Sequence, residues 1–304
     1  MPELTAPQVE PEFAQRIRAR GAVLDLEFAR ELYVPLLEAQ VRAGVEVERD
    51  IAYGEDPRHR LDVYRVPGAG PLPVLLFFHG GGFIRGDKAQ RENIGLCFAR
   101  RGFLVALANY RLAPAHRWPA GGEDVVAACE WVRARIAAFG GDARRVCLAG
   151  ESAGAAHVAT ALLLRRLQPR QGLSASAGVL ISGVYNAYLE HLARRQFAIA
   201  TPDPRNEAYF GTDFGAYRAM SLVELVDAPP VPLLITFAEL DPVQMQVQAG
   251  ELFARLLVHH RFECDIDVIR GHNHLTQVYS VNTADESLSG PVLRFLRQRL
   301  VESA

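Results

Sequence analysis

A serine between two glycines, in the string Gly150-Glu151-Ser152-Ala153-Gly154, could supply a nucleophile. An apolar, strand-like run precedes the string and an apolar, helix-like pattern follows it. A serine on such a sharp strand-to-helix turn projects its hydroxyl clear of the backbone, and the crowded turn needs small residues on either side. The alternative is a chance match, but the strand-before, helix-after context weighs against it. We therefore expect Ser152 to attack a carbonyl carbon.

A second glycine-rich string, His79-Gly80-Gly81-Gly82-Phe83, follows the most apolar run of the chain. Attack on a carbonyl creates an oxyanion, and backbone N–H groups stabilise it only where no side chain keeps the substrate oxygen away. A phosphate-binding loop would need a lysine followed by a serine or threonine, which this string lacks. The string therefore predicts an oxyanion hole, in which His79 braces the loop and is not the general base.

The serine hydroxyl needs a base, and the base needs a carboxylate that orients it. In folds that carry such a serine, the order along the chain is serine, acid, histidine. Asp241 follows the apolar run Leu233–Phe237 and precedes a proline, which favours a loop at a strand end. Asp265 and Asp267 are the competitors, but they alternate within the next strand-like run, as solvent-facing strand residues do. We therefore predict Asp241 as the acid.

Two histidines follow the last strand-like run, in the string from Arg270 to His274 (Arg-Gly-His-Asn-His). Because His272 and His274 occupy the same post-strand loop, spacing alone does not decide which of them is the base. A metal site built on His-Asn-His lacks a further cluster of ligands. We therefore expect no metal and no organic cofactor.

Apolar runs typical of strands buried on both faces alternate with helical patterns through most of the chain. This alternation predicts a mostly parallel, doubly wound α/β sheet with helices on both faces. Ligands bind such sheets at the carboxyl ends of the strands, where the candidate residues also lie. The strand-like runs are Pro73–Phe78, Phe103–Ala108, Val146–Ala149, Gly178–Ile181, Leu233–Phe237 and Ile266–Ile269, and the helical patterns are Val125–Ile136, Ala155–Leu167, Gln244–Leu257 and Pro291–Leu300.

Two segments fall outside this alternation. Residues 13–43 have a helical pattern, with apolar residues repeating every four positions, and Pro35 is expected to kink or split the helix. Residues 186–229 are richer in aromatic, proline and polar residues and have no strand pattern. We expect one catalytic domain at residues 45–304, N-terminal cap helices at residues 1–44, and a cap insertion near residues 186–229 above the carboxyl edge of the sheet.

The composition of the 304-residue chain limits the kind of protein that it can be. Hydrophobic residues make up 49%, enough for a sizeable core, and a formal net charge of −2 with interspersed signs gives no nucleic-acid footprint. The four cysteines are scattered without metal-ligand spacing, and we expect them to be reduced. No signal-peptide pattern and no membrane-length apolar run is evident. We therefore expect a soluble cytoplasmic protein that neither binds nucleic acid nor inserts into a membrane.

With their flanking residues, the two glycine-rich strings resemble the α/β-hydrolase fold and, within it, the hormone-sensitive-lipase-like (family IV) carboxylesterases. The resemblance implies an eight-stranded, mostly parallel sheet flanked by helices, with a helical cap. The family's catalytic histidine follows a glycine as G-x-x-H, which implies His274 rather than His272. Its oxyanion donors map onto the N–H groups of Gly81, Gly82 and Ala153. Further matching segments are Tyr110–Pro114, Trp118–Ala120, Asp124, Trp131, Val132, Phe139–Asp142 and Ala238–Pro242, whereas Ala115, Ala155 and Ala156 replace residues common in the family.

The resemblance implies a serine hydrolase that cleaves carboxylic esters, short-acyl or aryl, through an acyl-enzyme on Ser152, with Asp241 orienting His274. An arylformamidase-like amide hydrolase is the alternative that uses the same residues. A catalytically silent receptor, as in the plant gibberellin receptors, is a third hypothesis. It is disfavoured because those receptors lack the histidine that is present here.

Aromatic residues of the predicted cap and of the glycine loop are candidates for the wall of a substrate pocket, since ligand sites favour aromatic walls. We single out Phe83, Tyr185 and Phe214. The competing interpretation is that these rings pack the cap against the domain. The expected partner is a small-molecule ester. The oligomeric state cannot be read from the pattern, and a homodimer is kept as a hypothesis.

Overall fold

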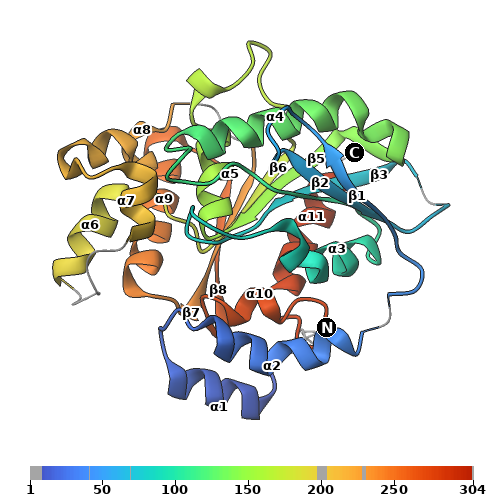
Figure 1. The fold of residues 1–304 in the computed structure, drawn as a ribbon, viewed down its shortest axis with the longest axis horizontal. Coiled ribbons are helices and arrows are strands. Elements are labelled where there is room, and N and C mark those ends of the chain that lie inside the picture. The colour runs from blue at the N-terminus through green and yellow to red at the C-terminus, as the bar shows by residue number, and fades with distance from the viewer. Residues whose placement is uncertain (1–8, 41, 69, 197–203, 228–230, 303–304) are drawn as a thin grey trace.

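The computed structural model describes residues 9–40, 42–68, 70–196, 204–227 and 231–302. Its strands are β1 (Glu46–Ala52), β2 (Arg60–Arg65), β3 (Leu72–Phe78), β4 (Leu104–Ala108), β5 (Gly141–Glu151), β6 (Ala177–Ile181), β7 (Leu233–Leu240) and β8 (Cys264–Asn273). They form an eight-stranded sheet in the order β1-β2-β4-β3-β5-β6-β7-β8 (Figure 1). β2 pairs antiparallel with β1 and β4, and every other pair is parallel. The predicted mostly parallel sheet is therefore confirmed.

Helices cover both faces of this sheet (Figure 1). One hydrophobic cluster joins the sheet to α4, α5 and α9, and a second joins its other face to α3 and α11. The bounds of these helices are α3 (Glu92–Ala99), α4 (Ala120–Arg135), α5 (Ala153–Leu163), α9 (Val243–His260) and α11 (Ser289–Leu300).

Strand β3 consists of an unbroken apolar run because both of its faces are buried. Its seven residues are all buried, and successive side chains point to opposite faces. Leu76 and Phe78 belong to the cluster with α4 and α5, whereas Leu75 and Phe77 belong to the cluster with α3 and α11. A polar residue on either face of β3 would therefore enter a hydrophobic core.

The N-terminal helical pattern forms two helices, α1 (Pro11–Arg20) and α2 (Leu26–Glu38), but the division is not at Pro35. The first helix ends at Gly21, where φ is +72°. α2 runs through Pro35 and ends one turn later, so the missing proline N–H removes little of its hydrogen bonding. Of the two expectations for Pro35, the split is wrong and the kink stays a prediction.

Shorter elements complete the described chain. They are α6 (Ala187–Gln196), α7 (Pro204–Phe210), α8 (Leu222–Leu225), α10 (Thr276–Tyr279) and the 3₁₀ turns η1 (Lys88–Arg91), η2 (Ile136–Phe139), η3 (Arg165–Leu167) and η4 (Phe214–Met220). The predicted cap insertion corresponds to α6, α7, η4 and α8, and residues 197–203 and 228–229 of it lie outside the described residues, as do residues 1–8 and 41 of the predicted N-terminal cap.

The carboxyl ends of the parallel strands carry the residues singled out from the sequence. β3 leads into His79, β5 into Ser152, β7 into Asp241 and β8 into His274. Because these strands are parallel, their carboxyl ends meet at one edge of the sheet. β6 leads into Ser182 at the same edge.

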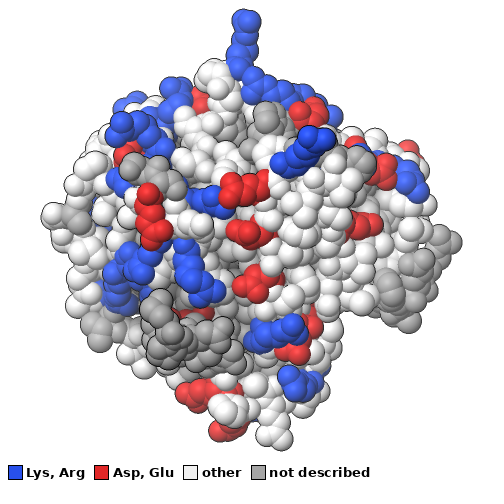
Figure 2. All heavy atoms as spheres, turned by 180° about the vertical axis from the view of Figure 1, so that it is seen from behind, with Lys and Arg blue, Asp and Glu red and all other residues white. Residues whose placement is uncertain are grey.

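The surface opposite the view of Figure 1 carries both signs of charge, with basic and acidic side chains interspersed (Figure 2). None of the helices in the described part of the chain is long and apolar enough to cross a membrane.

Candidate active site

Ser152 lies on a strained turn between β5 and α5. Its φ is +50° and its ψ is −118°, a backbone conformation that non-glycine residues rarely adopt. The Ser152 N–H donates to the carbonyl of Ile181 at 2.8 Å, which ties the turn to β6. The flanking glycines are required by space: a Cβ on Gly150 would lie 2.5 Å from the carbonyl carbon of Gly154, and one on Gly154 would collide with the carbonyl oxygen of Phe78.

Ser152 faces a histidine and, beyond it, an aspartate. His274 Nε2 lies 3.0 Å from Ser152 Oγ, and His274 Nδ1 lies 2.6 Å from Asp241 Oδ1. Asp241 and His274 are buried, whereas the serine is partly exposed. A neutral imidazole that donates from Nδ1 to the carboxylate presents an acceptor nitrogen to the hydroxyl, which is the geometry for removing its proton.

The charge balance at His274 favours a basic imidazole. Burial lowers the pKa of His274, but the charge and hydrogen bond of Asp241 outweigh burial and raise this pKa above the usual 6.5. The imidazolium formed on proton transfer is therefore stabilised by its own partner.

The glycine-rich loop lies beside the serine, since a Cβ on Gly80 would be 3.2 Å from Cβ of Ser152. Gly81 and Gly82 have φ of +140° and +59°, and within the described residues no protein acceptor takes their N–H groups. A Cβ on Gly81 would collide with the carbonyl oxygen of Arg85. Ala153 is the first residue of α5, so its N–H has no intrahelical acceptor. The role of these three N–H groups as oxyanion donors stays a prediction.

A sequence model described as the α/β-hydrolase fold matches residues 75–278, which is more than half of the chain. This chain belongs to the α/β-hydrolase family. It is 35% identical over 259 residues to a probable isoprenylcysteine alpha-carbonyl methylesterase, ICMEL2, of Arabidopsis thaliana, a match that covers 81% of this chain and 60% of the relative. The chain spans 60% or less of the length of the first curated relatives that it matches.

Solved structures agree on the α/β-hydrolase fold over nearly the whole chain. A bacterial heroin esterase superposes with a TM-score of 0.73 at 24% identity, covering 97% of this chain and 99% of that one. An esterase from the bacterial hormone-sensitive lipase family superposes with a TM-score of 0.69 at 24% identity, covering 96% of this chain and 100% of that one. These likenesses match the fold class that the sequence predicts.

The second histidine of the pair, His272, has other partners. His272 is the penultimate residue of β8, and its Nε2 lies 3.0 Å from Asp285 Oδ2. Its Nδ1 lies 3.2 Å from the hydroxyl of Thr276. The structure therefore brings His274, and not His272, to Ser152.

His79 braces the glycine-rich loop through a hydrogen bond to its backbone. Its Nδ1 donates to the carbonyl of Gly80 at 2.6 Å, and its ring stacks on Tyr110 with centroids 4.5 Å apart. Burial lowers the pKa of His79 to about 4, so the ring is neutral at pH 7. This placement agrees with the expected bracing role.

Arg91 is a residue of this edge that the sequence patterns did not indicate. The Glu151 carboxylate accepts from the N–H of Gly80 at 2.9 Å and forms a buried ion pair with Arg91. Burial would lower the pKa of Arg91, but the Glu151 charge raises it. The pair joins the turn before Ser152 to the start of the glycine-rich loop, and no local pattern in the sequence reveals such a long-range contact.

Of the three aromatic residues proposed for the substrate pocket, Phe83 and Phe214 pack against other rings, and Tyr185 is buried. Phe83 is 2% exposed and stacks on Tyr209 of α7 at 4.3 Å. Tyr185 is 1% exposed, and its hydroxyl accepts from the N–H of Gly183. Phe214 is partly exposed and stacks on His191 at 4.1 Å. Their contact with a substrate stays a prediction, and in this conformation Phe214 offers the most ring surface.

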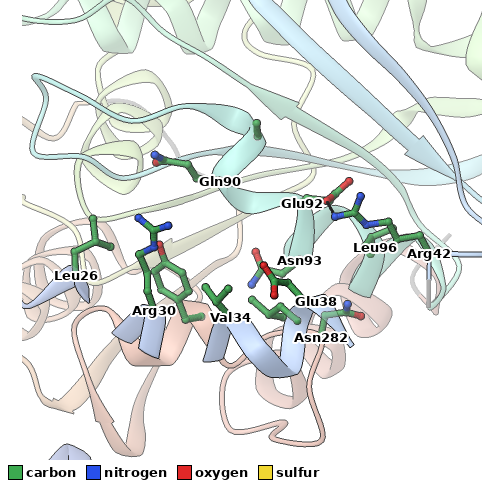
Figure 3. Close-up of a pocket in the computed structure, with 13 residues that line it drawn as sticks. Leu26, Arg30, Val34, Glu38, Arg42, Gln90, Glu92, Asn93, Leu96 and Asn282 are labelled. Atoms are coloured by element: carbon green, nitrogen blue, oxygen red, sulfur yellow. Dashed lines mark ion pairs between the residues drawn. The ribbon is translucent and has the colours of Figure 1, made fainter. Parts of the chain in front are cut away.

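A cavity of about 340 Å³ lies between α2 and α3, beside α10 (Figure 3). Leu26 and Arg30 of α2 face Gln90 across it. None of the predicted site residues lines this cavity. Tyr279 lines the cavity, and its ring lies 5.1 Å from the guanidinium carbon of Arg91. The cavity therefore borders the Arg91 side of the glycine-rich loop's support and not the predicted site residues themselves.

Proposed function

We propose that this α/β hydrolase cleaves carboxylic esters through an acyl-enzyme on Ser152. The contact of His274 Nε2 with Ser152 Oγ at 3.0 Å, with Asp241 on the opposite ring nitrogen, supports the proposal most directly. The relatives named above are esterases by their names. None of them is named as an amide hydrolase, so the formamide alternative becomes an arm of the test.

In the proposed reaction, His274 takes the Ser152 proton as the hydroxyl oxygen attacks the ester carbonyl. The oxyanion accepts hydrogen bonds from the N–H groups of Gly81, Gly82 and Ala153. The carbonyl re-forms as the alcohol leaves with the proton from His274. Water then attacks the acyl-enzyme by the same route and frees the acid. Each step uses groups of this chain.

A substrate panel tests the proposal. We expect turnover of p-nitrophenyl acetate, p-nitrophenyl butyrate and phenyl acetate, with the rate falling for the decanoate, because the aromatic side chains above the site are closely packed. N-formylkynurenine is the amide arm of the panel. Faster turnover of N-formylkynurenine than of every ester would overturn the ester assignment.

The raised pKa of His274 predicts the pH dependence of catalysis. The imidazole is a base only when neutral, so kcat/KM is expected to fall below a pH that lies above 6.5. This fall on the acid side of the pH profile is its acid limb. Asp241→Asn should move the acid limb to lower pH, because the charge that raises the pKa of His274 is gone. Asp285→Asn is the matched control: Asp285 contacts His272, and its loss should leave the limb in place. A wild-type limb at or below pH 6 would contradict this prediction.

We propose that residues 1–44 and the insertion near 186–229 form the cap. Contacts at the edge of the sheet support this. A Cβ on Gly82 would lie 2.5 Å from Cδ of Arg205 on α7, and one on Gly271 would collide with Val9. The insertion therefore lies against the glycine-rich loop, and the N-terminal segment lies against the end of β8, close to predicted site residues.

We also propose a homodimer. β8 is an edge strand of the sheet, and beside it α9 exposes four apolar residues, Val243 (42%), Val247 (41%), Leu257 (40%) and Val258 (73%). An unpaired strand edge and an apolar stripe are features that oligomer contacts bury. Light scattering should give twice the monomer mass, and Val247→Lys with Val258→Lys should give the monomer. A wild-type monomer at micromolar concentration would refute this idea.

A cytoplasmic location stays a proposal, supported by four cysteines that are all free and buried. Fractionation of the host cell tests it, and recovery in a secreted fraction would count against it.

A further inference from the structure

The second carboxylate oxygen of Asp241 is held by a buried chain of side chains. Asp241 Oδ1 faces His274, and Asp241 Oδ2 accepts from the hydroxyl of Ser182 at 2.5 Å and from the N–H of Ala238 at 2.8 Å. Gln277 Nε2 in turn donates to Ser182 Oγ at 2.7 Å. These side chains are buried, so water does not compete for the bonds.

The direction of each hydrogen bond in this chain follows from its neighbours. Gln277 Nε2 lies 3.2 Å from the carbonyl oxygen of His274, which can only accept. The nitrogen of the amide, and not its oxygen, must therefore face this point. Ser182 Oγ accepts from that nitrogen, so its own proton points to Asp241.

Ser182 holds its place at a conformational cost. Its φ is +47°, a region where glycine is the usual residue, and it directly follows β6 at the edge that carries the catalytic candidates. Such outliers persist where the surrounding structure requires them, and they gather at functional sites.

We propose that Ser182 and Gln277 are positioning residues for the acid–base pair. Gln277 fixes the Ser182 hydroxyl and the backbone of His274, and the hydroxyl fixes the rotation of the Asp241 carboxylate so that its other oxygen meets His274. The proposal rests on the ester hydrolase function, because it assigns Asp241 and His274 as acid and base.

Ser182→Gly tests the role of the hydroxyl without backbone strain, because glycine adopts a φ of +47° readily. Loss of a hydrogen bond to a charged group should lower kcat for p-nitrophenyl acetate about 10-fold or more, with KM unchanged. Ser182→Ala leaves less room for a replacing water and should lower kcat equally. Gln277→Met should lower kcat about 5-fold. Arg261→Gly is the matched control: Arg261 also has a positive φ, +53°, at the exposed end of α9, and kcat should not change.

The pH profile separates positioning from a merely structural role. The charged groups that act on His274 are Asp241 at the end of β7, Glu151 of β5 and Arg205 of α7. Removing the Ser182 hydroxyl leaves more negative charge on the Asp241 oxygen that faces His274. The acid limb of kcat/KM should therefore move to higher pH.

A double-mutant cycle and a spectrum of the resting protein complete the test. On an Asp241→Asn background, Ser182→Gly should change kcat less than about 2-fold, because the charge that the hydroxyl serves is absent. In the wild-type protein, the His274 Nδ1 proton should give a downfield ¹H NMR signal, and Ser182→Gly should shift it.

The outcomes distinguish this proposal from the proposed function. A wild-type protein that cleaves no ester refutes the function, and the NMR signal and its shift in Ser182→Gly still report on positioning. A protein that cleaves esters, in which both Ser182 variants keep the wild-type kcat, acid limb and NMR signal, overturns the inference.

Discussion

Ser152→Ala is expected to lower kcat for p-nitrophenyl acetate about 10⁴-fold or more while the protein stays folded. In the proposed mechanism the hydroxyl oxygen of Ser152 forms the acyl-enzyme, and alanine has no oxygen there to replace it. The backbone of the turn is held independently of the side chain, by the bond from the Ser152 N–H to Ile181 and by the glycines on either side. Activity and folding should therefore separate.

The measurement compares steady-state hydrolysis with labelling by a fluorophosphonate probe, which reacts with activated serines. Wild-type protein should be labelled at Ser152, and Ser152→Ala should carry no label. Ser176→Ala is the matched control, because Ser176 binds the carbonyl of Arg144 at 2.9 Å, near the start of β6 and away from its carboxyl end. Retention of more than a few per cent of the wild-type kcat by Ser152→Ala, at an unchanged melting temperature, would remove the serine from the mechanism.

The fold could be predicted because strands that are buried on both faces consist of continuous runs of apolar residues. β3 is buried on both faces, so every position in it must be apolar, and the run Pro73–Phe78 shows this directly. The spacing of these runs by helical patterns then allows few topologies other than a doubly wound sheet. Candidate residues at the ends of the runs meet at one edge because the strands are parallel.

Contacts between distant segments could not be predicted in the same way. Arg91 and Glu151 are far apart in sequence, and nothing in the local pattern of η1 shows that its arginine lies buried beside the turn that carries Ser152. Ser182 follows the run Gly178–Ile181 just as Asp241 follows its own strand, so the rule of strand ends would have included it. The sequence does not single it out because Ser182, unlike Ser152, has no glycine two residues before it and two residues after it.

The choice between the two histidines also depended on a strand boundary. Residues two apart share a face in an extended strand, so His272 and His274 would point the same way if both belonged to β8. β8 ends at Asn273, and the chain turns there, so His274 leaves the strand and faces Ser152. Boundaries of this kind are set by tertiary contacts and not by the local sequence.

His274→Ala is expected to lower kcat by about 10⁴-fold or more, close to the effect of Ser152→Ala, because the serine and its base act as a unit. His272→Ala is expected to stay within about 5-fold of wild type, because His272 contacts Asp285 and Thr276. Loss of that buried partner should instead cost about 1–3 kcal/mol in the free energy of unfolding. His274→Ala should therefore change mainly kcat, and His272→Ala should change mainly the free energy of unfolding.

A double variant, Ser152→Ala with His274→Ala, tests whether the two residues act in the same step. Ser152→Ala with His274→Ala should be no slower than either single variant, because each one alone already disables the same step. The free energies of unfolding come from urea titrations, and kcat comes from p-nitrophenyl acetate at saturation. If His272→Ala abolished turnover and His274→Ala did not, the base would be His272, and the pairing of His274 with Asp241 would be structural. If both variants kept turnover, hydrolysis would depend on neither histidine, because the imidazole of His274, which lies within hydrogen-bonding distance of Ser152, would be dispensable.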